Sequence, residues 1–437
     1  MSFEQAAALA VLIAAVAAMI WGKLRSDIVA LTGAATLMAL GVVRPSEVQG
    51  AFASPAILAL AALFVIAYAM EQSGLLGALI RVAIRFCRRL GSLGVWIVIA
   101  LCGAASAFLN NTPIVVLAAP VVRDVSTSLN LSPRRYLIPL SYVTIMGGSC
   151  TLIGTSTNLL VNDMARSAGQ PAFNIFDVTP VGLIIALVGG LYLALAAPRL
   201  LSGKAASPPV PVAEALEDAS ARVDGSVGDP TVFLPNDRPL DLRRGLISLG
   251  VFVIVVAVAA VGWAPIAASA FTGAVVLILL RVISPDEAYR GLRPEILLLI
   301  AGMVVIGLSL ELTGLAATAT EGLIGMVQGL GPHMAMILLY GVTLFLTEIL
   351  SNAAVAVLLT PVAVALAESL GVSTQPFLVA VMMAASAAFA TPFGYQTNVL
   401  VYEMGGYSYL DFLKIGLPLN LVTWAAAALA IPTFFPF

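Results

Sequence analysis

Four short polar segments interrupt otherwise apolar stretches of this sequence. Residues 106–113 and 347–354 lie in the middle of long apolar runs, and residues 154–158 and 391–398 follow later in each half of the chain. All four consist largely of small residues and of residues that carry side-chain oxygen or amide groups. Irregular backbone at membrane depth is tolerated only where it is buried in protein or lines a watery cavity. The four segments therefore predict a polar site inside an apolar protein.

These segments have the composition of helix ends that bind ions. Thr112 is a good N-cap, Pro113 suits the first helical position, and Asn158 and Asn398 are further N-cap candidates. The free N–H groups and partial positive charge of four helix N-termini form an anion site without Arg or Lys. On the other side of each segment, unpaired carbonyls with hydroxyl and amide oxygens suit a hard cation such as sodium. Cations bound there offset the charge of the anion.

Glu348 is a carboxylate inside the second long run, where a charge is costly. Two roles stay open for it: binding a cation or a proton, or acting as an internal hydrogen-bonded strut. Ala107 stands at the corresponding position of the first half. No nucleophile, acid–base pair or metal-like cluster accompanies Glu348, since the chain has one histidine, His333, and three scattered cysteines. The sequence therefore does not predict an enzyme.

The composition identifies a polytopic membrane protein. Of the 437 residues, 60% are hydrophobic and 10% are charged, against about 25% charged residues in soluble domains. So few charges cannot cover a water-soluble surface, which excludes a cytosolic enzyme and a secreted disulfide scaffold. The 21 Lys and Arg against 23 Asp and Glu leave no basic excess for binding nucleic acid.

Ten apolar runs are long enough to cross a membrane. They lie at residues 6–21, 28–43, 56–70, 136–165, 179–198, 246–262, 265–283, 296–310, 376–403 and 412–433. Two further stretches, 93–126 and 334–369, are broken in the middle and are predicted to be re-entrant hairpins. If the N-terminus is outside, all 21 Lys and Arg except Arg44 and Arg166 fall on the inner side. This charge bias predicts a bacterial-type inner membrane protein with both termini outside.

The two halves of the chain repeat each other. A shift of about 240 residues aligns residues 31–34 with 271–274 and residues 71–75 with 311–315. Each half has five crossings and one hairpin, and the odd number of crossings inverts the second half. Inverted repeats with broken helices are typical of secondary transporters, which bind substrate at the repeat interface. The expected division is residues 1–202 for the first repeat, 203–243 for a cytoplasmic linker and 244–437 for the second repeat.

The paired hairpin tips give the chain its resemblance to a known family. The tips Asn110-Asn111-Thr112 and Ser351-Asn352-Ala353, with the later Gly-Thr and Thr-Asn segments, resemble the divalent anion:sodium symporter family. The resemblance covers nearly the whole chain apart from the linker. It implies an all-α homodimer with a scaffold domain and a mobile transport domain, which carries the site across the membrane by an elevator-like motion.

The resemblance also implies which residues bind the ions, with two or more sodium ions expected beside a divalent anion. The first sodium site would involve Ser106, Asn110, Asn111 and Gly154, and the second would involve Thr347, Ser351, Asn352 and Gly394. The anion would meet Asn111, Thr112, Thr155, Ser351, Asn352 and Thr397.

Departures from the family pattern bear on the substrate. The first tip has Asn110 where the family has Ser, and the second has Ala353 where the family has Thr. Members that handle dicarboxylates keep both Ser-Asn-Thr tips, whereas this form looks like the sulfate-permease branch, without the soluble regulatory domains of that branch. The sequence thus predicts a sodium-coupled importer of a small divalent oxyanion, with sulfate as the first candidate. A C4-dicarboxylate symporter, proton coupling through Glu348, a passive anion channel and a metalloid permease stay open as alternatives.

Overall fold

The computed structural model describes residues 2–21, 24–75, 77–79, 82, 90–201, 240–292, 294–315, 331–392 and 394–437. All its regular elements there are helices, which confirms the predicted all-α class. Helices of the first half are α1 (Phe3–Trp21), α2 (Ser26–Ala39), α3 (Pro45–Phe52), α4 (Pro55–Gln72), α6 (Ser92–Ser106), α7 (Asn111–Ser128), α8 (Arg134–Gly148), α9 (Ser156–Ser167) and α10 (Thr179–Leu200). Helices of the second half are α12 (Leu242–Ala260), α13 (Ile266–Leu279), α14 (Pro285–Gly291), α15 (Pro294–Leu312), α17 (Gly331–Thr347), α18 (Asn352–Ser369), α19 (Gln375–Ala385), α20 (Gln396–Gly405) and α21 (Tyr409–Phe434). Most of the expected linker, residues 203–239, lies outside the described residues.

The polar segments divide the long apolar runs into separate helices. Run 136–165 is split into α8 and α9, and run 376–403 into α19 and α20. Two short helices, α3 and α14, were not among the expected runs. Each begins at a proline, and the Glu at its third position accepts the N–H of the N-cap residue, at 2.7 Å in α3 and 2.8 Å in α14. These capping boxes explain why helices form at both places.

Several helices are suited to a lipid bilayer. In the described part of the chain, five helical stretches are long and apolar enough to cross a membrane, judged by length and composition. Their exposed side chains include Leu187, Leu191 and Leu429, each more than 60% exposed. Exposed leucines on long apolar helices are unfavourable in water and favourable against lipid tails. The predicted character of a polytopic membrane protein agrees with these helices.

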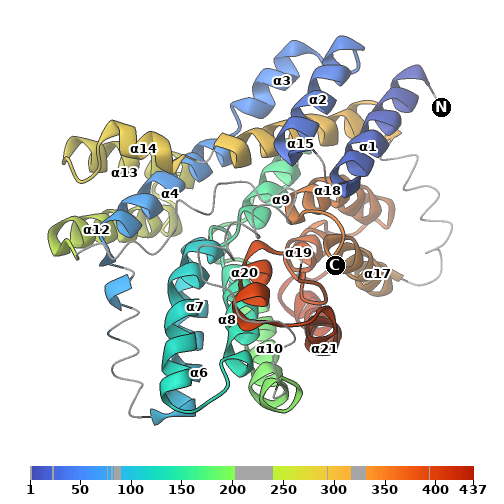
Figure 1. Cartoon of the computed structure of the whole chain (residues 1–437). Helices are drawn as coiled ribbons and strands as arrows, with labels where there is room; N and C mark the ends of the chain where they lie inside the picture. Colours follow the sequence, from blue (N-terminus) through green and yellow to red (C-terminus); the bar gives the residue numbers. More distant parts are fainter. Residues whose placement is uncertain are drawn as a thin grey trace.

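The helices form two groups, and each group takes helices from both halves of the chain (Figure 1). In the first group, α2 packs against α15, and α4 packs against α12, α13 and α14. In the second group, α6, α7 and α8 pack together, α10 packs against α21, and α18 packs against α9 and α19. The main contacts between the groups are α15 with α18 and α4 with α9.

Glycines allow the closest helix approaches inside each group. A methyl group on Gly302 of α15 would lie 2.7 Å from the carbonyl carbon of Ala30 in α2. A methyl group on Gly147 of α8 would overlap the backbone of Gly103 in α6. Small residues let helix backbones pack tightly where lipid gives no hydrophobic drive for association.

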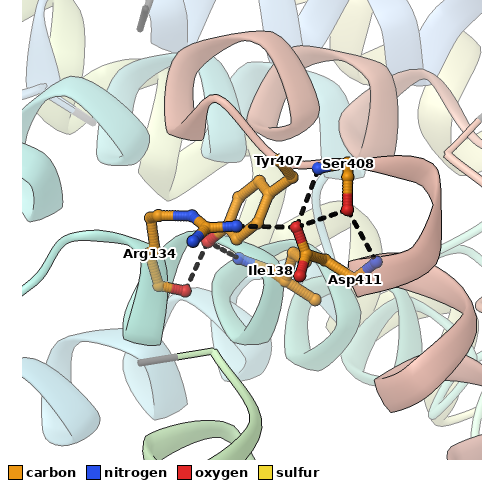
Figure 2. Close-up of polar contacts among 5 residues, drawn as sticks. All are labelled: Arg134, Ile138, Tyr407, Ser408 and Asp411. Atoms are coloured by element: carbon orange, nitrogen blue, oxygen red, sulfur yellow. Dashed lines mark hydrogen bonds and ion pairs between the residues drawn. The ribbon is translucent and has the colours of Figure 1, made fainter. Parts of the chain in front are cut away.

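A buried ion pair joins the start of α8 to the start of α21 (Figure 2). The Arg134 guanidinium donates to an Asp411 carboxylate oxygen at 2.6 Å and lies over the Tyr407 ring, 4.9 Å from its centre. The Tyr407 hydroxyl donates to the Arg134 carbonyl, and the Ser408 backbone N–H donates to Asp411 at 2.8 Å. The Arg134 and Asp411 side chains are 8% and 17% exposed. This cluster fixes one end of the second helix group.

Replacing Arg134 by methionine is expected to destabilise the protein by about 2 kcal/mol, because Asp411 loses a charged hydrogen-bond partner at a mostly buried position. The matched control is Arg244→Met. Arg244 and Asp241 are 50% and 48% exposed in their pair, and exposed pairs contribute about 1 kcal/mol or less. Thermal unfolding of the two variants in detergent tests the difference. Equal melting temperatures would contradict the anchoring role of Arg134.

Candidate functional site

The first hairpin tip lies between α6 and α7. Helix α7 begins at Asn111, and its N-cap is Asn110, whose side chain accepts the Thr112 backbone N–H at 3.2 Å. The prediction that Thr112 caps this helix is therefore wrong by two residues. The Ser106 hydroxyl, at the end of α6, donates to the Asn111 side-chain oxygen. Ser106, Asn110, Asn111 and Thr112 thus lie together at one tip.

Backbone carbonyl oxygens converge on Gly154. A methyl group at Gly154 would lie 2.7 Å from the Ala107 carbonyl oxygen, 2.9 Å from that of Ser106, and closer still to that of Gly148. The Asn111 side-chain oxygen borders the same space, 2.6 Å from where a methyl on Gly148 would be. The absence of a side chain at Gly154 therefore lets three backbone carbonyl oxygens approach its Cα closely. Oxygens alone are the ligands that hard cations prefer.

The second hairpin tip repeats these contacts with other residues. Ser351 is the N-cap of α18, and its hydroxyl accepts the Ala354 N–H at 3.4 Å. The Thr347 hydroxyl lies 2.8 Å from the Asn352 side-chain oxygen and 2.6 Å from the Ala385 carbonyl oxygen. Thr347 and Asn352 thus stand to each other as Ser106 and Asn111 do in the first tip.

Glu348 gives the second tip a feature that the first lacks. One carboxylate oxygen accepts two backbone N–H groups and the other accepts a third, from residues 389–391, at 2.9, 2.7 and 2.9 Å. The Asn420 amide in α21 donates a fourth hydrogen bond at 2.8 Å. Glu348 is therefore an internal hydrogen-bonded strut between the tip, the connection before α20, and α21. One of its oxygens also lies 3.4 Å from where a methyl on Gly394 would be.

Asn158 and Asn398 stabilise the connections between α8 and α9 and between α19 and α20, but they do not cap the helices that follow. The N-cap of α9 is Thr155, and that of α20 is Tyr395. Each Asn amide instead donates back to carbonyls of the preceding connection, Asn158 to Thr151 at 3.0 Å and Asn398 to Ala388 at 2.8 Å. Among the described residues, the buried side-chain oxygen of Asn158 has no hydrogen-bond partner. The predicted capping roles of both asparagines are therefore wrong.

Two contacts connect the first tip to the start of α20. The Asn111 amide donates to the Tyr395 hydroxyl at 2.8 Å, and the Thr112 hydroxyl donates to the Gln396 side-chain oxygen at 3.1 Å. Thr397 points elsewhere, because its buried hydroxyl lies 2.8 Å from the Ser141 hydroxyl in α8. Of the residues predicted to bind the anion, Asn111 and Thr112 therefore contact α20 directly, whereas Thr397 is held by α8.

Sequence reasoning missed four residues of this region. Tyr395 and Gln396 were inside a predicted polar segment, but no role was given to them. Their larger size could have indicated a role, since the smaller residues Thr155 and Ser156 stand at the corresponding positions of the first half. Gly148 and the Ala107 carbonyl were missed because backbone ligands leave little trace in a sequence.

The sequence of the chain is similar to those of known membrane proteins. Its sequence matches the citrate transporter family over residues 16–371. An uncharacterized transporter of Synechocystis sp. is 26% identical, covering 97% of this chain and 96% of the relative. A 46 kDa membrane protein of Mycobacterium leprae is 26% identical, with 93% of each chain covered.

Two further similarities concern a substrate and a fold. Sodium/sulfate cotransporter 1 of Chlamydomonas reinhardtii is 32% identical over 34% of this chain and 17% of its own length. The crystal structure of the YdaH transporter of Alcanivorax borkumensis superimposes with a TM-score of 0.59 at 16% identity, covering 96% of this chain and 98% of that chain. The second match concerns the fold alone.

Proposed function

This chain belongs to the citrate transporter family, and from that premise we propose that it imports a small divalent oxyanion, sulfate first, together with sodium ions. The family and its named relatives are transporters and not enzymes. Three relatives from Chlamydomonas reinhardtii carry names as sodium/sulfate cotransporters, which supports sulfate and sodium for this chain. The single observation that carries the proposal is the convergence of backbone carbonyl oxygens at Gly154, directly beside the first hairpin tip.

The two kinds of ion bind to opposite chemistry in this proposal. The first sodium ion binds the carbonyls around Gly154 and the oxygen of Asn111; the second binds beside Gly394 with Thr347 and Asn352. The anion binds between the tips, where the N-termini of α7 and α18 direct free N–H groups and partial positive charge toward it. Sodium beside the anion lowers the net charge that must cross the membrane.

The two helix groups serve as scaffold and transport domains. The group with α6–α10 and α17–α21 contains both tips, and the other group contains neither. A cavity of about 490 Å³ lies between the groups, lined by residues that include Ser54, Asp163, Gly307 and Thr360. A seam with a cavity of this size supports sliding of one group against the other, as an elevator mechanism requires. Ten crossings in two inverted repeats, a homodimer, and termini outside an inner membrane complete the proposed arrangement.

Uptake of labelled sulfate by proteoliposomes tests the proposal. The expected result is saturable uptake that needs an inward sodium gradient and that unlabelled succinate does not block. Entry of labelled succinate, with block of sulfate, would assign the protein to C4-dicarboxylates instead. Uptake driven by a proton gradient without sodium would contradict sodium coupling, and uptake that does not saturate would indicate a channel.

Replacing Gly154 by alanine is expected to raise the sodium concentration for half-maximal uptake about tenfold, a loss of about 1.4 kcal/mol in sodium binding. The added methyl would lie under 3 Å from the carbonyl oxygens of Ser106, Ala107 and Gly148 and would force them apart. Gly190→Ala in α10 is the matched control, because no atom lies within 4 Å of a methyl there. Sodium titrations of uptake measure both variants, and an unchanged sodium requirement in Gly154→Ala would remove this cation site.

A further inference from the structure

Two side chains at the start of α20 engage residues that are predicted to bind the anion. The Tyr395 hydroxyl accepts the Asn111 amide at 2.8 Å and is also hydrogen-bonded to the Thr155 side chain. The Gln396 side-chain oxygen accepts the Thr112 hydroxyl at 3.1 Å. Tyr395 and Gln396 therefore meet three anion-site residues that come from the first hairpin tip and the start of α9.

The corresponding positions of the first half do not provide such large side chains. Thr155 stands where the second half has Tyr395, and Ser156 stands where it has Gln396. The Thr155 hydroxyl accepts the N–H of Thr157 in its own helix, at 3.4 Å. Two long side chains from the start of α20 therefore contact the first tip. The start of α9 carries two short side chains at the corresponding positions.

This asymmetry limits what the first tip can offer a substrate. One N–H of the Asn111 amide and the Thr112 hydroxyl donate hydrogen bonds to Tyr395 and Gln396, so these two hydrogens are already engaged. A C4 dicarboxylate carries a carboxylate at each end and needs free donors at two separated places. A tetrahedral oxyanion carries its charge on one centre and needs donors at one place only. Specificity of this kind comes from excluding the wrong ligand as well as from binding the right one.

We propose that Tyr395 and Gln396 are specificity-determining residues that restrict the site to oxyanions with a single charged centre and exclude dicarboxylates. Tyr395 contributes its ring as a wall, and its hydroxyl, which accepts from Asn111, can direct its own proton toward the anion. Gln396 closes the adjoining side at Thr112. The inference rests on the proposed function, since it concerns the same anion site.

The test exchanges these residues for their first-half counterparts. Tyr395→Thr, Gln396→Ser and the double variant are reconstituted in proteoliposomes, and initial uptake of labelled sulfate and labelled succinate is measured in each. The double variant is expected to take up succinate, with the succinate-to-sulfate ratio raised at least tenfold and each single variant in between. Tyr395→Phe keeps the ring and loses the hydroxyl. It is expected to raise the KM for sulfate severalfold while succinate stays excluded.

Controls keep the outcome interpretable. Tyr289→Thr in α14 makes the same exchange at a side chain that is 68% exposed and far from the tips in sequence, so its ratio should equal that of the unchanged protein. An unchanged ratio in the monodisperse double variant would overturn the inference. If the double variant aggregates, the single variants give the same ratio test.

The failure of this inference differs from failure of the proposed function. If the unchanged protein takes up succinate as readily as sulfate, the proposed exclusion of dicarboxylates is wrong, while sodium coupling is unaffected. Sulfate uptake that does not depend on sodium would overturn the proposed sodium coupling. A raised succinate-to-sulfate uptake ratio in the variants would still support the exclusion of dicarboxylates.

Discussion

Replacing Asn111 or Asn352 by alanine is expected to abolish anion uptake while the protein still folds. Each asparagine begins the second helix of a hairpin and has its oxygen held by a hydroxyl, from Ser106 or Thr347. In the proposed site, alanine removes at once the side-chain oxygen assigned to sodium and the amide assigned to the anion. The loss of two such interactions amounts to about 3 kcal/mol or more, and uptake should fall roughly 100-fold or beyond.

Labelled sulfate uptake in proteoliposomes, together with the elution profile and melting temperature in detergent, measures this effect. Asn174→Ala provides the control, because Asn174 is exposed and bonds to Asp177 in its own turn. Its uptake should match that of the unchanged protein. Normal uptake by either tip variant would show that the assigned site is wrong.

Replacing Glu348 by glutamine is expected to destabilise the protein by about 3 kcal/mol and to reduce uptake more than tenfold. The carboxylate accepts three successive backbone N–H groups at residues 389–391, and a neutral amide can accept fewer of them and sets its own N–H₂ against the rest. The connection before α20 then loses its fixed shape, and Gly394 moves with it. Glu348→Asp keeps the charge on a shorter side chain and should recover part of both losses.

Glu368→Gln is the control for this change, because Glu368 is exposed and its carboxylate accepts a hydrogen bond from the Gln170 amide at 3.0 Å. An exposed substitution of this kind should alter stability by about 0.5 kcal/mol or less. Thermal unfolding and sulfate uptake are measured on all three variants. If Glu348→Gln is as stable as the unchanged protein, Glu348 does not act as a strut.

The positions of the helix breaks were predictable from the sequence, whereas the capping residues were not. Polar residues in an apolar run mark a break because unpaired backbone needs partners at membrane depth. At the first tip, however, Asn110, Asn111 and Thr112 are all capable N-caps. Which of them caps depends on the residue at which the backbone leaves the extended conformation. The structure selects Asn110, and a similar ambiguity led to Asn158 in place of Thr155.

Contacts between the two halves were beyond sequence reasoning for a different reason. Tyr395 lies 284 residues from Asn111 along the chain, and nothing in local periodicity indicates that the two side chains meet. For Glu348 the sequence left a choice between a cation ligand and a strut. Four hydrogen-bond donors around its carboxylate are visible only once three segments have been brought together.

The interleaving of the two halves has a consequence for how the protein is made. Helix α2 packs against α15, and α4 against α13, so the partners of these early helices are translated only in the second half of the chain. At about 5–20 residues per second, α2 waits for tens of seconds before α15 leaves the ribosome. During that time the face of α2 that later meets Gly302 is covered by lipid or by the insertion machinery. Membrane insertion and tertiary assembly must therefore be separate events in this protein, with assembly delayed until the second half has been synthesised.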